Sequence, residues 1–168
     1  MESFTAVKNY VLRDIEALLK RDQIDEEYLL WVVTINLFSI HNSAVRNPGK
    51  KLSMKINDCV LIPFSNLEMT QAEIMQRTAV KEYATRLHIE LMGSILARAV
   101  RCCQGNFKSI RKYMPAISIF CEWLQCHYEA MRPDPRQDKR PWTALWKHLA
   151  SLLSHLITTD YCGEGNSI

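Results

Sequence analysis

Apolar side chains recur at steps of three and four residues along most of this chain, and this period constrains its fold more than any other feature. The pattern is clearest near the C-terminus, at relative positions 0, 3, 4, 7, 10, 11 and 14 of one segment (Trp142, Leu145, Trp146, Leu149, Leu152, Leu153 and Leu156). Such spacing places the side chains on one face of an α-helix. Turn pairs built from Gly, Asn and Asp are scarce, and no segment requires a β-strand. The sequence therefore predicts an all-α fold.

The period and the local start and stop signals predict five helices. Their expected spans are about residues 3–20, 25–42, 70–104, 115–128 and 141–159, with a short helical segment over 106–114. Asp25 suits an N-cap, and Thr70 with Glu73 fits a capping box. Pro115 suits the first turn of a helix, where its missing N–H costs nothing, and Gly105 suits a helix end.

The helix predicted over residues 70–104 is the longest, because 35 residues at 1.5 Å each make a rod of about 50 Å. Its expected buried stripe recurs at three- and four-residue steps (Ala84, Leu87, Leu91, Ile95 and Ala99). At Gly93 and Ser94 we expect a kink or a closely packed neighbour. The helix over 25–42 is apolar on most sides and is expected to be central.

These helices are expected to form one domain over residues 1–160, since 168 residues suffice to bury one core. Antiparallel helical hairpins stacked in an α-solenoid-like manner are the predicted architecture. Residues 43–69 break the helical pattern and contain the turn signal Asn47-Pro48-Gly49, so they are predicted to form a mobile loop. Residues 161–168 are predicted to be a frayed tail.

The overall composition is that of an ordinary globular protein, with 48% apolar and 23% charged residues. The N-terminus has acidic residues and no apolar core of a secretory signal, and no apolar run reaches the length that a membrane span needs. The six cysteines include the adjacent pair Cys102 and Cys103, which is awkward for a disulfide framework. We therefore expect an intracellular protein without a membrane partner.

Positive charge is concentrated in one part of the chain, although the net charge is only +3. Residues 93–147 hold ten basic and four acidic residues, an excess of six positive charges. The candidate nucleic-acid-binding residues are nine cations of this region (Arg98, Arg101, Lys108, Arg111, Lys112, Arg132, Arg136, Lys139 and Arg140). The alternative is an ordinary solvated surface, in which cations at the end of the long helix complement its dipole. If the last two helices form a hairpin, 108–112 and 132–140 lie at opposite ends of it.

Catalytic and metal chemistry find no support in the sequence. Cys121 and Cys126 are five residues apart on a predicted helix, so their sulfur atoms point apart by about 140°. The five histidines all fall within helical patterns and are interpreted as surface or boundary residues. No glycine-rich phosphate loop and no His-Glu-x-x-His motif is present. We predict no catalytic residue, no metal, no cofactor and no enzymatic activity.

Three segments carry a resemblance to a known family. MPAISIFCEWLQ (114–125), PWTALWKHLASLLSHL (141–156) and LLWVVTINLFSIHNS (29–43) resemble the C-terminal helical region of the Est1/Smg family. Its members are telomerase-associated and nonsense-mediated mRNA decay factors, and the fifth or seventh Smg factor is most similar. The shared features are Met114-Pro115-Ala116 at a helix start, the pair Trp123-Leu124, and a leucine-rich helix opening with Trp142. The resemblance covers about residues 11–44 and 84–157.

The resemblance implies stacked helical hairpins that follow a 14-3-3-like domain, whose phosphoserine pocket binds the Upf helicase. This chain starts too late to include that domain, so it is expected to be part of a longer protein. The implied function is a non-catalytic scaffold in mRNA decay, with other decay factors such as a Smg-type heterodimer partner. The alternative is binding of RNA or telomeric single-stranded DNA through the basic region 98–140. The implied location is the cytoplasm, with shuttling to the nucleus.

Overall fold

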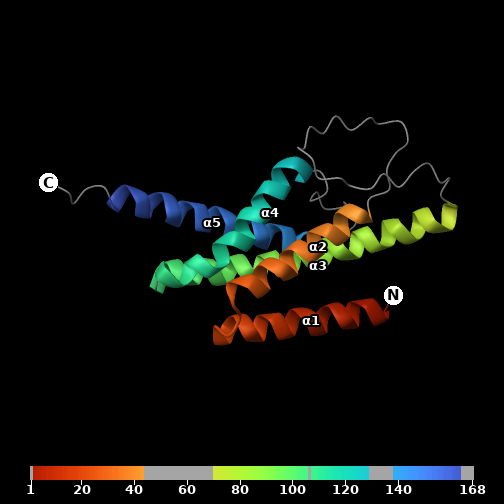
Figure 1. The fold of residues 1–168 in the computed structure, drawn as a ribbon, viewed down its shortest axis with the longest axis horizontal. Coiled ribbons are helices and arrows are strands. Elements are labelled where there is room, and N and C mark those ends of the chain that lie inside the picture. Colours follow the sequence, from red (N-terminus) through yellow and green to blue (C-terminus); the bar gives the residue numbers. More distant parts are fainter. Residues whose placement is uncertain (1, 44–69, 106, 129–137, 164–168) are drawn as a thin grey trace.

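The computed structural model describes residues 2–43, 70–105, 107–128 and 138–163 (Figure 1). The elements in chain order are five α-helices and one 3₁₀-helix: α1 (Glu2–Arg21), α2 (Glu26–Asn42), α3 (Gln71–Gly105), η1 (Phe107–Tyr113), α4 (Met114–His127) and α5 (Arg140–Gly163). No strand occurs in these ranges, so the all-α prediction is confirmed. The last helix continues past the expected end at Thr159. The predicted loop, apart from Ser43, and most of the predicted tail lie outside the described residues.

The long helix α3 organises the molecule, because α1, α2, η1 and α5 all pack against it. Helices α2 and α3 run antiparallel as one hairpin, α1 lies below this pair in the view and packs on α3, and α4 crosses the pair steeply (Figure 1). Helix α5 packs mainly on α3, whereas α4 packs mainly on α2. A hairpin between the last two helices, which the sequence left open, is therefore not the main packing unit of either helix.

The helix starts follow the predicted signals closely. The carboxylate of Asp25 accepts a hydrogen bond of 2.7 Å from the backbone N–H of Tyr28, which caps α2. At the start of α3, the backbone N–H of Thr70 donates to Glu73 Oε2 at 2.8 Å, and Glu73 N–H donates to Thr70 Oγ1 at 3.3 Å. This reciprocal pair confirms the capping box. Pro115 occupies the first turn of α4, as its fixed φ favours.

Helix α1 ends in a left-handed residue that the sequence did not single out. Asp22 has a φ of 59°, a left-handed conformation that is unfavourable for most residues other than Gly, Asn and Asp. The backbone N–H of Asp22 donates to Leu19 O at 3.3 Å, and that of Gln23 donates to Leu18 O at 3.1 Å. These two bonds are those of a Schellman motif, which satisfies carbonyls that the helix end would leave unpaired.

The core lies where α3 meets α2, η1 and α5. Its largest fully buried side chains come from all of these elements and from α4 (Tyr113, Phe120, Leu29, Ile40, Ile89, Leu91, Met92, Ile95, Leu96, Leu145 and Leu152). The predicted stripe of α3 is buried except for Leu87, which is only partly exposed. The stripe predicted for α5 is wrong in part, because Trp146 and Leu153 are exposed.

Two expectations about burial are wrong. Helix α2 is not enclosed: Trp31, Ile35 and Phe38 are each about 60% exposed, on a face that α3, α4 and η1, its neighbours in the described part of the chain, leave open. His88 is not a surface or boundary residue, because its exposed fraction is 0%. It lies on the side of α3 that faces α2, where the Asn36 side chain provides a polar contact.

Candidate nucleic-acid interface

An open groove of about 720 Å³ runs between α1 and α5, with α3 as its floor. The middle of the floor is formed by the small residues Gly93, Ser94 and Ala97 of α3. A Cβ atom added at Gly93 would meet no other atom within 4 Å. Close packing against a neighbour therefore does not explain this glycine, contrary to one of the two sequence-based expectations. The small side chains instead leave the groove open.

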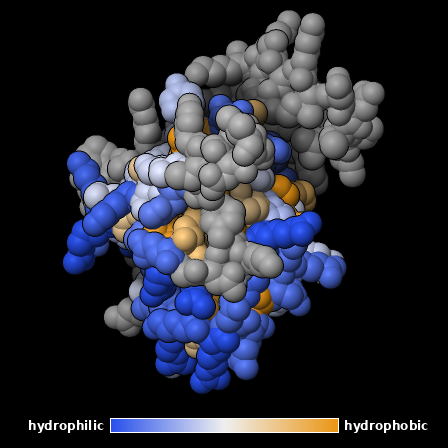
Figure 2. Space-filling view, turned by 90° about the vertical axis from the view of Figure 1, so that its left-hand side faces the viewer, coloured by the Kyte–Doolittle hydropathy of each residue, from blue (hydrophilic) through white to orange (hydrophobic). Residues whose placement is uncertain are grey.

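Charged side chains line the groove from all three helices. Five are basic (Lys8, Lys20, Arg86, Arg101 and Arg140) and three are acidic (Glu16, Glu90 and Asp138), an excess of two positive charges. Figure 2, which looks at the molecule along its length from the side at which α5 projects, shows hydrophilic side chains gathered over its lower part. A groove with one excess sign of charge attracts ligands of the opposite sign.

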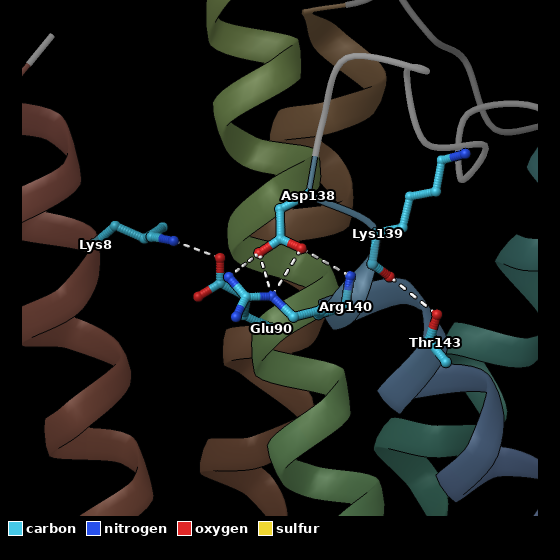
Figure 3. Close-up of polar contacts among 6 residues, drawn as sticks. All are labelled: Lys8, Glu90, Asp138, Lys139, Arg140 and Thr143. Atoms are coloured by element: carbon cyan, nitrogen blue, oxygen red, sulfur yellow. Dashed lines mark hydrogen bonds and ion pairs between the residues drawn. The ribbon is translucent and has the colours of Figure 1, made fainter.

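Two of the groove's cations are paired at its upper rim (Figure 3). Lys8 of α1 reaches across to Glu90 of α3. The guanidinium of Arg140 holds both oxygens of Asp138, with Nε at 3.0 and 2.9 Å and Nη2 at 2.8 Å. These hydrogen bonds lower the pKa of Asp138 and raise the pKa of Arg140, so both side chains of the pair are charged at neutral pH. These four side chains contribute no net charge to the groove.

The excess of two positive charges comes from Lys20, Arg86 and Arg101, offset by the single negative charge of Glu16. Within the described ranges none of the three forms an ion pair. Arg101 is exposed, and its Nε donates to the carbonyl of Ala97 at 3.3 Å, which leaves its terminal nitrogens available. His148 lies on the α5 side of the groove, and burial lowers its pKa, so it is neutral at neutral pH.

A second group of cations is engaged within the protein instead. The carboxylate of Asp22 is contacted by Lys112 Nζ, by Arg98 Nη2 at 3.9 Å and by the hydroxyl of Tyr113, which donates at 3.2 Å. Lys112 lowers the pKa of this carboxyl the most, and burial raises the pKa of Tyr113 to about 12. The cluster connects the end of α1 to η1. Arg98 and Lys112 therefore stabilise the packing of these elements and are already engaged by Asp22.

The comparison with known proteins decides the family. Residues 2–164 match the family model described as the Est1 DNA/RNA binding domain. The chain belongs to the Est1 DNA/RNA binding domain family. The resemblance drawn from the three sequence segments is therefore confirmed.

Two curated relatives of this Est1-family chain are similar at modest identity. It is 24% identical over 165 residues to the telomerase-binding protein EST1A of Danio rerio, covering 80% of this chain and 9% of that protein. It is 26% identical over 113 residues to the nonsense-mediated mRNA decay factor SMG7 of Arabidopsis thaliana, covering 66% of this chain and 9% of that protein. The chain thus spans only about a tenth of the length of these relatives. No solved structure matches it.

The structure brings together only part of the predicted basic set of this Est1-family domain. Arg101 and Arg140 line the groove, whereas Arg111 is exposed elsewhere and Lys139 points away from the rim (Figure 3). The side chains of Lys108, Arg132 and Arg136 lie outside the described residues. The described residues therefore do not form one continuous basic patch over 98–140.

Three groove cations were missed because they precede the basic region of the sequence. Lys8 and Lys20 come from α1, and Arg86 comes from the first half of α3. One signal in the sequence could have found the groove side of α3. Five residues at steps of three and four positions share one face of this helix (Arg86, Glu90, Gly93, Ala97 and Arg101).

Cysteines and histidines give no sign of a reactive site in the described part of this Est1-family chain. No three His, Cys, Asp or Glu side chains there converge as metal ligands would. Burial raises the pKa of the Cys103 and Cys121 thiols, which disfavours the nucleophilic thiolate. In the same residues, no helix combines the length and apolar character needed to cross a membrane.

Proposed function

We propose that this domain is a non-catalytic part of an Est1-type protein and binds single-stranded RNA or DNA through the groove between α1, α3 and α5. One observation carries the proposal: Lys20, Arg86 and Arg101 line one groove from two helices, and none of them forms a direct ion pair within the described residues. Cations of this kind neutralise phosphates and release the counterions condensed on the nucleic acid, which favours binding. The name of the matched family, a DNA/RNA binding domain, agrees with this function.

The groove suits a single strand lying along α3. Arg86 and Arg101 are 15 residues apart on one helix, which corresponds to about 22 Å along its axis. This span is long enough for several phosphates of one strand. The groove side chains are mainly charged or small, so we expect contacts with the phosphate backbone and little sequence preference.

Fluorescence anisotropy with a labelled oligouridine or oligothymidine of about 12 nucleotides tests the proposal. Affinity should fall steeply with salt concentration. In a plot of the logarithm of the binding constant against the logarithm of the salt concentration, the slope should be about −0.7 for each phosphate contact. The triple variant Lys20→Glu, Arg86→Glu, Arg101→Glu should abolish most of the binding. The matched control reverses Arg111 and Lys139, two exposed cations away from the groove. Equal loss in both variants, or affinity that is insensitive to salt, would contradict the assignment to the groove.

A second function, protein scaffolding, is favoured by a different observation. Helix α2 exposes large apolar side chains that its own domain does not cover within the described residues. The relatives are named for binding telomerase and for mRNA decay. We therefore propose as the second candidate that this domain binds decay factors such as a Smg-type partner, with any contact to the Upf helicase made by another domain. It would act in the cytoplasm and shuttle to the nucleus.

Co-precipitation tests the scaffold function. The tagged chain is expressed in cells, and the precipitate is blotted for the Smg factors and for telomerase protein. Recovery of at least one of these from nuclease-treated extracts would support protein scaffolding, because nucleic acid no longer bridges the two. Recovery that disappears with nuclease would show that nucleic acid is the link.

A further inference from the structure

The exposed side of α2 carries four large apolar residues in a row. Tyr28, Trp31, Ile35 and Phe38 are 48%, 61%, 61% and 59% exposed, and their spacing of three, four and three residues places them on one helix face. We call these four residues the α2 stripe. It extends for about 15 Å, or three helical turns. An apolar face of this kind marks an interaction surface.

A pocket of about 360 Å³ adjoins the stripe between α2 and α4. Leu37 and Phe38 line it from α2, Ile119 and Trp123 line it from α4, and Glu122 lies at its edge. Such a volume admits one large side chain. The Trp123 ring is held by stacking on His127, with ring centroids 5.0 Å apart and planes 9° apart, and by an edge contact with His88. The pocket wall is thus formed in advance of binding.

The charged side chains of the two helices that form this surface have one sign. Over residues 25–42 and 114–127 the charged side chains are Asp25, Glu26, Glu27 and Glu122, and neither segment contains Lys or Arg. The groove over α3 has the opposite sign. An acidic, apolar surface repels nucleic acid and anionic membranes, and it complements a ligand that is both apolar and basic.

We propose that the α2 stripe and the α2/α4 pocket bind a basic amphipathic helix of a partner protein. The partner helix lies along the stripe with apolar residues at i, i+3 or i+4, and i+7, and inserts one of them beside Trp123. Its basic residues face Glu27 at one end and Glu122 at the pocket. This inference names the partner chemistry of the scaffold function and rests on that function.

Defined peptides test this site. The probe is a fluorescein-labelled helical peptide of about four turns, with Leu on one face and Lys on the other, because the stripe spans about three turns. Its controls are an acidic twin, with Glu for each Lys, and a scrambled peptide of the same composition. The full chain should bind the basic helix at least about tenfold more tightly than either control.

Variants locate the binding. Trp31→Ser with Phe38→Ser should weaken the basic peptide by about tenfold or more, because exposed aromatic anchors carry most of such binding. Glu27→Gln with Glu122→Gln should weaken it several-fold and flatten its salt dependence. The matched control is Val7→Ser, which changes an equally exposed apolar residue on α1 and should bind as the unchanged chain does.

Five outcomes would overturn the inference. The acidic or scrambled peptide could bind equally well, or the stripe variants could bind the basic peptide unchanged. Light scattering could show a dimer that the stripe variants dissolve, which would make a second copy the occupant. A variant lacking residues 44–69 could bind the peptide when the full chain does not, which would make that segment the occupant. If named decay factors still co-precipitate with a stripe variant, the inference fails while the scaffold function stands.

Discussion

The side-chain amide of Asn36 on α2 lies 3.2 Å from Nδ1 of His88 on α3, and this contact joins the two helices inside the core. Both side chains are buried, and the ring of Phe120 packs against the imidazole with centroids 5.4 Å apart. If the amide nitrogen donates, Nδ1 accepts and Nε2 carries the proton of a neutral ring. No hydrogen-bond partner of Nε2 is found among the described residues. Burial lowers the pKa of His88 to about 3.

His88 should make the protein sensitive to mild acid. Its folded pKa lies below the unfolded value of 6.5, so between these values the unfolded chain binds the extra proton. Above pH 6.5, His88 is neutral in both states and the folded protein keeps its full stability. As the pH falls from 6.5 toward 3, protonation of His88 in the unfolded chain lowers the free energy of unfolding. Each pH unit in this window costs about 1.4 kcal/mol, so urea unfolding at pH 4.5 should give a free energy about 2–3 kcal/mol lower than at pH 7.5.

The variant His88→Gln isolates this effect, because glutamine does not titrate and can still bond to Asn36. It should be less stable than the unchanged chain at pH 7.5, yet its stability should change less between pH 7.5 and 4.5. His148→Gln is the control: burial also lowers the pKa of His148, but this residue is only partly buried. If His88→Gln keeps the full pH dependence, other groups cause the acid sensitivity.

Periodicity predicted the helices well but could not predict this contact. An apolar spacing reveals which face of a helix is buried, but not how many neighbours surround it. Helix α3 is packed by four other elements, so even its polar His88 is enclosed. Among the described elements, α2 packs on α3, α4 and η1, and its apolar Trp31 remains exposed. Depth of burial depends on the packing of helices that are distant in sequence.

Asp22 provides a test of backbone conformation at the end of α1. Asp22→Ala should lower the free energy of unfolding by about 1–2 kcal/mol, because alanine disfavours the left-handed conformation and loses the contacts to Lys112 and Tyr113. Asp22→Asn should cost less than about 1 kcal/mol, since asparagine tolerates this conformation and the lost ion pairs are partly exposed. Urea denaturation measures both. Equal costs for the two variants would show that the backbone conformation contributes nothing.

The capping box of α3 should act locally. Thr70→Ala removes the hydroxyl that receives the backbone N–H of Glu73 and donates to its carboxylate. Most side chains in the first turns of α3 are exposed, so little packing holds this end. Hydrogen exchange of residues 71–76 should accelerate severalfold, while exchange near Ile95 stays unchanged. Acceleration throughout α3 would mean that the cap stabilises the whole helix.

The groove was less predictable than the helices that form it. Local signals such as Asp25, Thr70 and Pro115 act within a few residues, and each was recognisable in the sequence. The groove joins Lys20 to Arg101 across about 80 positions, and only the packing of α1 on α3 brings them together. Charge density along the sequence instead drew attention to Arg98 and Lys112, which the fold uses to bind Asp22.

Gly93 separates the stability of α3 from the openness of the groove. Gly93→Ala should raise the free energy of unfolding by up to about 1 kcal/mol, because alanine favours the helix and its Cβ meets no atom within 4 Å. Gly93→Trp should place a bulky ring over the floor between Lys20 and Arg86. It should keep at least the stability of the unchanged chain and weaken oligouridine binding several-fold in the anisotropy assay. Gly93→Ala is the matched control, with nearly unchanged affinity. Unimpaired binding by a folded Gly93→Trp variant would place the nucleic acid outside this groove.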